Sequence, residues 1–338
     1  MINLKFSTSQ IQCQIKSFSA HSKIFISIIC ISFLSCISNT TQKFDSDFDI
    51  QIDRFEKKFF EISEDSISNL INEYPFLFSN EFDVSNWIEI KRDSTRNYIY
   101  NKTVNIFEDT SGLEKDFKKI FSRAKGYFPN FDIPKIITLN NGVDYKYNLI
   151  DSDSIILLSL DCYLDDELLY GNIPKHISDQ MNPDFISNDI NELISSRFIE
   201  FPTDRKFISK IIYHGKLLFL MNKLSDNNPS ELLGYDKIKS SWINENEKEV
   251  WKYFIENDLL FSTKSSLDYR FLANSPFSKF GLSIDYQSPP MVGRWLGFQI
   301  VESFSKKSTK NLIEILAYDN YELYLESNYK PEIRNEKN

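Results

Sequence analysis

The sequence has little histidine, cysteine, glycine or proline: 3 His, 4 Cys, 9 Gly and 11 Pro among 338 residues. So few glycines and prolines argue against a loop-rich or many-turned all-β fold. The chain also lacks a Walker A phosphate loop, a glycine-rich dinucleotide-binding turn and a Gly-x-Ser-x-Gly nucleophile elbow. These absences argue against nucleotide-driven and α/β-hydrolase chemistry, and we expect no cofactor.

A zinc peptidase site would need histidines that this chain does not have in the required spacing. Such a site places two His four residues apart on one helix, together with a Glu that acts as base. The histidines are His21, His176 and His214, and the residue four positions after His214 is Leu218. We therefore expect no zinc pair on the helix that carries His214.

The cysteines predict no disulfide framework. Of Cys13, Cys30, Cys36 and Cys162, only the last two would remain after cleavage before Cys36. If Cys36 carries a lipid, Cys162 has no cysteine partner, even in an oxidising compartment.

The charge balance is acidic. Residues 1–36 hold three lysines and no acid, so the remainder has 36 basic against 48 acidic side chains, a net charge of −12. Nucleic-acid binding needs clustered Lys and Arg, and docking on anionic lipid needs a basic surface. We therefore expect no nucleic acid as partner, and no small-molecule substrate is evident.

The N-terminus is typical of a bacterial lipoprotein. Residues 1–23 are polar with only positive charge, and residues 24–36 (IFISIICISFLSC) form an apolar run of about a dozen residues, too short to span a bilayer comfortably. The run ends in Phe33-Leu34-Ser35-Cys36, which resembles a lipobox, whereas Cys30 follows the bulky Ile29. We predict lipidation of Cys36; an uncleaved N-terminal anchor helix is the alternative, and it also tethers the chain to a membrane.

These features divide the chain into four parts. We predict a lipoprotein signal peptide at 1–35, the lipidated Cys36 and a flexible tether at 36–49, a single α+β domain at 50–331 and a polar tail at 332–338. No other stretch reaches 18 apolar residues, so we expect no further transmembrane segment.

The hydrophobic periodicity of the domain is mostly helical. We predict helices from residue 50, at 84–107 and 112–127, and then at 183–199, 204–224, 235–257, 289–306 and 309–326. Ser111-Gly112-Leu113-Glu114 resembles a capping box that would open the helix at 112.

Short strands are expected in the middle of the chain. Residues 135–139 (KIITL), a run reaching Ile150 and residues 155–160 (IILLSL) are separated by the turn signals Asn140-Asn141-Gly142 and Asp151-Ser152-Asp153. The sequence therefore predicts an α+β fold, predominantly helical, with a small and mostly antiparallel sheet.

Five local patterns follow in order along the second half: SLDCYLD at 159–165 with LY at 169–170, FISKIIYHGKLLF at 207–219, WINENE at 242–247 with VWKYFI at 250–255, PPMVGRWLGFQIV at 289–301 and SNYKP at 327–331. Together, and behind a lipobox, they resemble the gliding-motility lipoprotein family GldB of gliding Bacteroidota, over roughly residues 45–331.

That resemblance implies a role in gliding motility and in the linked secretion of surface adhesins, with no known enzyme activity. It also implies a fold distantly similar to zinc metallopeptidases, in which the helix at 207–221 would take the place of the zinc-binding helix. The candidate positions within the motifs, of unknown role, are Asp161, His214, Lys216, Trp242, Arg294 and Trp295.

Each candidate position also has a structural interpretation. His214 shares an apolar stripe and reads as a packing residue more than a catalytic one. Asp161 and Asp165 are either a turn and a helix cap or ligands of a hard cation. The tryptophans read as core residues, and an Arg294–Asp161 ion pair is suggested only by the resemblance.

The glycine pair at 293 and 297 permits either close helix packing or a ligand-binding turn. The first interpretation is favoured, because Pro289 and Pro290 stand where a helix is expected to begin.

The expected function is that of a non-enzymatic, membrane-anchored lipoprotein of the gliding and secretion machinery. Its partners would be the membrane, through the lipid on Cys36, and other envelope proteins, and the domain would face the periplasm. A membrane-tethered, divergent metallopeptidase-like hydrolase is the alternative.

Overall fold

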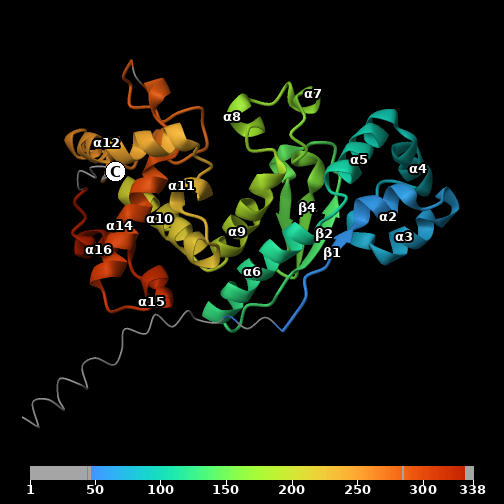
Figure 1. The fold of residues 1–338 in the computed structure, drawn as a ribbon, viewed down its shortest axis with the longest axis horizontal. Helices are drawn as coiled ribbons and strands as arrows, with labels where there is room; N and C mark the ends of the chain where they lie inside the picture. The colour runs from blue at the N-terminus through green and yellow to red at the C-terminus, as the bar shows by residue number, and fades with distance from the viewer. Residues whose placement is uncertain (1–43, 45–46, 284, 332–338) are drawn as a thin grey trace, which may run out of the picture. The chain divides into compact units, whose positions relative to one another are not determined.

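The computed structural model describes residues 44, 47–283 and 285–331 (Figure 1). The chain divides into two units, Met1–Phe44 and Asp45–Asn338, and the fold below is that of the second. The predicted signal peptide, Cys36, most of the tether and the tail at 332–338 lie outside the described residues.

The described chain is an α+β fold with many helices and one small sheet, which confirms the predicted class. Its strands are β1 (Ile52–Arg54), β2 (Lys135–Leu139), β3 (Leu149–Asp151) and β4 (Ile155–Ser159). Its α-helices are α2 (Phe55–Glu61), α3 (Ile67–Glu73), α4 (Val84–Arg92), α5 (Ser94–Ile106), α6 (Ser111–Tyr127), α7 (Glu167–Tyr170), α8 (Lys175–Ser178), α9 (Ile186–Ser196), α10 (Phe207–Leu224), α11 (Pro229–Leu232), α12 (Lys237–Glu256), α13 (Ser266–Phe271), α14 (Val292–Lys307), α15 (Leu312–Ala317) and α16 (Asn320–Ser327). Short 3-10 turns are η1 (Glu64–Ser66), η2 (Pro75–Leu77), η3 (Tyr145–Tyr147), η4 (Leu160–Cys162), η5 (Pro183–Phe185) and η6 (Asp285–Gln287).

The sheet has the order β1-β2-β4-β3, and its strand directions correct the sequence prediction. β1 pairs with β2 and β2 with β4 in parallel, and only β3 runs antiparallel, against β4. The turn at 152–154 does form the β3–β4 hairpin, as expected. The Asn140-Asn141-Gly142 turn does not form one, because β4 lies between β2 and β3 and so separates them.

The strands of the parallel part are buried on both faces. Ile136, Ile156 and Leu158 point into the main core, whereas Ile137 belongs to a smaller aromatic core on the opposite face. Successive side chains of a strand alternate between faces, so a strand covered on both sides reads as a continuous apolar run. The runs KIITL and IILLS have this character.

β1 is a second correction, since the sequence pattern predicted a helix from residue 50. Ile52–Arg54 obtain their strand partners from β2, more than 80 residues away, and helix α2 begins only at Phe55. A helix-like spacing of apolar residues says nothing about such a distant partner.

Two predicted helices are each divided into two by an aspartate. The span 84–107 breaks at Asp93, which accepts the Arg96 N–H (2.8 Å) and begins α5. The span 309–326 breaks at Asp319, which accepts the N–H groups of Tyr321 and Glu322 (both 2.9 Å) and begins α16. Aspartate favours such N-cap positions.

The expected capping box at Ser111 is wrong. Thr110 is the N-cap of α6 and makes no side-chain cap bond, while Asp109 accepts the Ser111 N–H (2.8 Å). Glu114 accepts the Ile52 N–H instead (3.1 Å), and so joins α6 to the start of β1.

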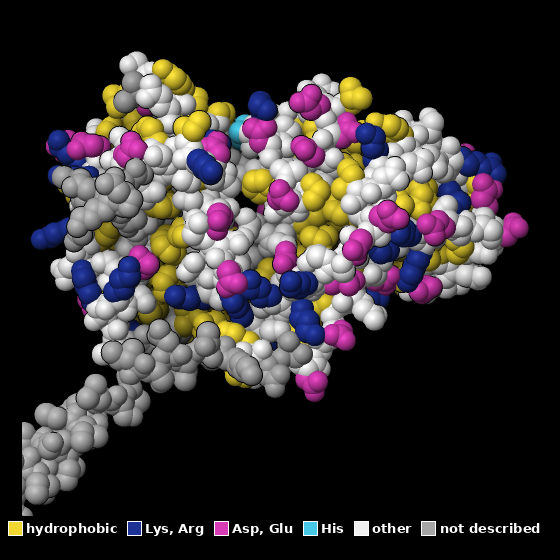
Figure 2. Space-filling view, in the orientation of Figure 1, with side chains coloured by type: hydrophobic (Ala, Val, Ile, Leu, Met, Phe, Trp, Pro, Cys, Tyr) yellow, Lys and Arg dark blue, Asp and Glu magenta, His cyan; other side chains and the backbone are white. Residues whose placement is uncertain are grey.

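Figure 1 places α2 to α5 at one end of the sheet and α10 to α16 at the other, with α6 and α9 between them. On the face drawn in Figure 2, acidic and basic side chains are interspersed. Within the described residues, no helix combines the length and the apolarity needed to cross a bilayer.

Helices α10 and α14 touch through their backbones. A Cβ built on Gly215 would overlap the backbone of Gly297, and one built on Gly297 would overlap the carbonyl of Ile211. Gly293 lies against Leu272 and Phe271 in the same way. Glycine at 293 and 297 therefore serves close packing, the interpretation favoured by the sequence.

We predict that Gly215→Ala destabilises the protein by about 3 kcal/mol, because the methyl group must push two helices apart. Gly112→Ala is the matched control, since a Cβ there meets nothing within 4 Å and alanine favours a helix. Thermal and urea unfolding of both variants measure the effect. Equal stability of the two variants would contradict the backbone contact.

Candidate functional site

Asp161 is held by the loop that follows β2. Its carboxylate accepts the N–H groups of Asn141 (3.1 Å), Gly142 (2.7 Å) and Val143 (2.8 Å), and it is fully buried. Gly142 and Val143 both have positive φ, 88° and 64°, and consecutive amides in such turns converge on an anion. Asp161 thus closes this loop onto the end of β4.

Asp165, the other proposed cation ligand, is exposed at a positive φ of 50°. The cap of α7 is the next residue, Asp166, which accepts the N–H groups of Leu168 (2.9 Å) and Leu169 (3.1 Å). Over the described residues, no group of three His, Cys, Asp or Glu is placed to hold a metal ion.

Lys216 is buried on α10 and donates to the carbonyl of Tyr318, the residue that ends α15. Burial lowers the pKa of Lys216 to about 8, and the nearby Asp319 opposes that shift. A cation at a helix C-terminus is favoured by the exposed carbonyls there. Lys216 therefore joins α10 to the C-terminal helices.

The two candidate tryptophans, Trp295 and Trp242, have different surroundings. Trp295 is buried and donates from Nε1 to Glu247 Oε2 (3.1 Å), while the Tyr329 hydroxyl donates to Glu247 Oε1 (2.7 Å). Trp242 is half-buried beside a surface cavity of about 230 Å³ that Tyr253 also lines. Three of the sequence motifs therefore meet at Glu247.

Glu247 lies within the motif at 242–247 but is not among the predicted site residues. Its helical spacing from Ile243, Val250 and Phe254 could have shown that Glu247 is buried, because all four lie on the buried face of α12. A lone acid on an apolar helix face must find donors when it is buried, which distinguishes it from its exposed neighbours.

Arg294 does not pair with Asp161, so the pairing suggested by the resemblance is wrong. Arg294 Nη1 bonds Glu192 Oε1 (3.1 Å) and its Nε donates to the Leu272 carbonyl (2.7 Å). Asp161 already has three backbone donors and needs no cation. The actual partner, Glu192, lies on α9.

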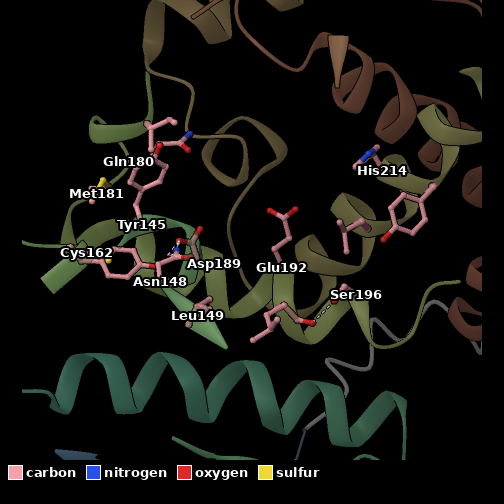
Figure 3. A pocket seen from close by; sticks show the side chains of 15 residues that line it. Tyr145, Asn148, Leu149, Cys162, Gln180, Met181, Asp189, Glu192, Ser196 and His214 are labelled. Carbon is pink, nitrogen blue, oxygen red and sulfur yellow. Dashed lines mark hydrogen bonds between the residues drawn. The ribbon is translucent and has the colours of Figure 1, made fainter. Parts of the chain in front are cut away.

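A cavity of about 460 Å³ lies where α9, α10 and the β3 edge meet. Figure 3 shows Asp189 and Glu192 projecting from one helix, with His214 on another. Its lining residues are Tyr145, Asn148, Leu149, Cys162, Tyr163, Ile177, Gln180, Met181, Asp189, Glu192, Leu193, Ser196, Tyr213, His214 and Leu217. A smaller cavity of about 150 Å³ shares Asp189, Glu192 and His214 and extends to Arg294.

Burial shifts the pKa values of two titratable groups of this cavity in favour of their neutral forms. Burial lowers the pKa of His214 to about 3, with Arg294 and Lys210 acting in the same direction. Burial raises the pKa of Asp189 to about 7, although a bond from the Tyr163 hydroxyl (2.6 Å) opposes the shift. The imidazole is therefore neutral, and its Nδ1 has no hydrogen-bond partner among the described residues.

The described lining of the cavity therefore offers hydrogen-bond donors and acceptors. In the described part of the chain, no hydroxyl or thiol bonds to His214, and the Cys162 thiol is buried beside Asn141 with a raised pKa. Asp189 and Glu192 were not predicted. Their spacing of three residues puts them on one face of α9, but such a polar stripe usually indicates only a solvated surface.

These features describe a helix-rich α+β protein in which most polar motif residues bond distant parts of the same fold, and in which His214 and Arg294 line a cavity. The chain belongs to the family described as Gliding motility protein GldB, whose sequence profile matches residues 38–331. It is thus a gliding motility-associated lipoprotein by family. No curated protein and no solved structure matches the chain.

We predict that Asp161→Asn lowers stability by about 2 kcal/mol, because its amide nitrogen would face one of the three backbone N–H donors. Asp165→Asn is the control, since asparagine tolerates positive φ at an exposed site. Urea unfolding compares the two. A stable Asp161→Asn protein would mean that the loop does not depend on this carboxylate.

We predict that Asp189→Asn changes the pH dependence of stability. The folded carboxyl binds its proton more tightly than the unfolded one, so wild-type stability falls as pH rises from about 4 to about 7. The asparagine has no such proton to lose, so the stability of Asp189→Asn should not fall in this way. Its free energy of unfolding relative to wild type should therefore rise with increasing pH, by at most about 1.4 kcal/mol per pH unit. Part of Asp189 remains open to the cavity, so the slope is an upper bound.

Urea unfolding at several pH values measures this slope. Asp184→Asn, at the exposed start of the same region, removes the same charge away from the cavity. Parallel stability curves for wild type and Asp189→Asn would show that Asp189 is ionised in both states.

Proposed function

We propose that the mature chain is anchored by a lipid on Cys36 and acts as a non-enzymatic binding component of the gliding machinery and of the linked protein-secretion machinery. The domain would face the periplasm, and its partners would be other envelope proteins. The family match over residues 38–331 carries this proposal, together with the lipobox-like Phe33-Leu34-Ser35-Cys36.

The use of the motif residues supports a non-enzymatic role. Trp295 and Tyr329 satisfy the buried carboxylate of Glu247, and Lys216 holds the end of α15. Side chains that serve as catalysts need a reacting group within hydrogen-bond reach. These side chains are instead bonded to other parts of the same fold, which suits a rigid binding component.

The cavity around His214 supports a binding role. Its volume of about 460 Å³ lies within the range of ligand sites, roughly 300–1,000 Å³. Its lining combines apolar side chains such as Leu149 and Leu217 with polar ones such as Asn148 and Gln180. Such a lining can receive a side chain of a partner protein and orient it by hydrogen bonds.

We predict that deletion of the gene abolishes colony spreading and reduces secreted surface proteins, and that only a lipidated chain restores both. Complementation with wild type, Cys36→Ala and Cys30→Ala tests this in the native host. Cys30→Ala is the matched control, because Cys30 lies in the predicted signal peptide six residues earlier. The expected order is full rescue by wild type and Cys30→Ala and failure of Cys36→Ala.

The two phenotypes separate the parts of the proposal. Full rescue by Cys36→Ala would show that the lipid anchor is not needed for the function. Lost spreading with normal secretion would restrict the role to motility. Normal spreading and secretion after deletion would contradict the proposed function altogether.

A further inference from the structure

A second cavity, of about 330 Å³, lies at the other end of the sheet, between α2, α4, α5 and the loop after β2. In Figure 1 these helices are the blue and teal ones. Its lining shares no residue with the cavity around His214. The lining residues are Phe55, Glu56, Phe59, Phe60, Leu77, Phe78, Phe82, Trp87, Ile90, Arg96, Ile99, Leu139, Asn140, Asn141 and Gly142.

The walls of this aromatic cavity are mostly apolar rings that already pack against one another. Trp87 lies edge-on to Phe78, with centroids 4.9 Å apart and planes at 81°, and to Phe59 at 6.4 Å and 84°. Aromatic pairs prefer such edge-to-face contacts. An alkyl chain has no preferred ring orientation, so it fits these walls better than a planar ligand that needs parallel faces.

One end of the aromatic cavity is basic. A Cβ built on Gly142 would lie 3.1 Å from Nη1 of Arg96 and 3.3 Å from its Cζ, so the guanidinium lies against this glycine. Gly142 has a φ of +88°, which a residue with a side chain rarely adopts. The loop thereby leaves space for Arg96 beside the cavity.

Arg96 is half-buried, and its guanidinium forms no ion pair or hydrogen bond with the described residues. The acids of this region are already bonded: Glu56 accepts from Arg54 and from Thr138 Oγ1 (2.7 Å), and Asp161 accepts the loop amides. A ligand anion would therefore meet an available cation at this end.

Two hydrogen-bond donors of the lining also lack partners. Trp87 Nε1 and Asn140 Nδ2 are buried and bond to no described group. Asn140 uses its Oδ1 to accept from Thr103 (3.2 Å), which leaves its amide nitrogen available to an acceptor. Buried donors without partners are costly, and a ligand oxygen that reaches them removes that cost.

We propose that this aromatic cavity binds a single-chain amphiphile with an anionic head, of which a medium-chain fatty acid carboxylate is the simplest case. The alkyl chain lies among the rings and the carboxylate pairs with Arg96. The volume, at the lower end of the range for ligand pockets, admits one short chain and excludes a diacyl lipid.

The test uses the full-length chain in lipid nanodiscs and a dodecanoate that carries a photoreactive diazirine near its methyl end. Crosslinked peptides are located by mass spectrometry, with octanoate, decanoate, dodecanoate and dodecanol as competitors. We expect saturable labelling at residues 55–60, 77–90 and 139–142. Competition should improve by about fourfold for each added methylene until the chain fills the cavity, and dodecanol should compete at least fivefold less well than dodecanoate.

Arg96→Gln should raise the concentration for half-maximal labelling at least fivefold. Arg92→Gln is the matched control, because Arg92 is exposed on α4 and pairs with Glu64 outside the cavity. Each variant is first checked for an unchanged melting temperature. If Arg96→Gln is unstable, the comparison of dodecanol with dodecanoate on the wild-type chain still shows whether the site requires an anionic head group.

Several results would overturn the proposal. Labelling spread over exposed apolar side chains would show that no site exists. If dodecanol competes as well as dodecanoate, or if Arg96→Gln and Arg92→Gln have equal effects, the site does not require an anionic head group. Equally strong labelling of the same peptides by a photoreactive phospholipid would replace the single-chain ligand by membrane lipid.

Discussion

The backbones of α10 and α14 touch where Gly215 meets Gly297, and the positions of the motif side chains depend on that contact. His214 and Lys216 flank one glycine, and Arg294 and Trp295 lie within one turn of the other. A close crossing puts His214 and Arg294 on the wall of one cavity. It leaves Lys216 and Trp295 to bond elements on other sides of the pair. Larger residues at this crossing would separate all four.

Asp161 has a similar role for the sheet. Its carboxylate accepts the N–H of Gly142, and Gly142 lies against Arg96 in the wall of the aromatic cavity. The next residues along the chain, Cys162 and Tyr163, line the cavity around His214. One buried carboxylate therefore holds the loop that lines the aromatic cavity, and it directly precedes two residues that line the other cavity.

The sequence predicted those features that depend on local residues. Long periodic helices such as α10 and α12 and the short β-branched runs of the sheet were recognisable because their patterns are regular. The direction of β2 relative to β4 was not, since it depends on which strand lies between them. Neither was the strand at Ile52, whose partner lies in β2. Asp93 and Asp319 divide long helical patterns because each caps the start of a new helix. The capping aspartate is a local signal, but the prediction gave more weight to the apolar periodicity.

For the candidate residues, burial could be predicted from the sequence but hydrogen-bond partners could not, for the same reason. Their burial follows from local pattern, but their partners lie far along the chain: Glu247 is 48 residues from Trp295 and 82 from Tyr329. The Arg294–Asp161 pairing is wrong because Asp161 accepts backbone N–H groups of the loop after β2, which no side-chain motif reveals, while Arg294 pairs with Glu192. Likewise Asp189 and Glu192 look like a solvated stripe until α10 and the β3 edge are placed against them.

The buried polar contacts also decide how losses of function in this protein are to be understood. Leaving a buried polar group without its hydrogen-bond partner costs about 1–3 kcal/mol, and more for a charged group, against the roughly 5–15 kcal/mol that stabilises a typical fold. A change at Glu247, Lys216 or Asp161 would therefore impair gliding by lowering the amount of folded protein. Under the function proposed above, replacing Cys36 would instead remove the lipid anchor. A defect at constant protein level is thus evidence for a binding or anchoring role, and a defect that follows protein level is evidence for a structural one.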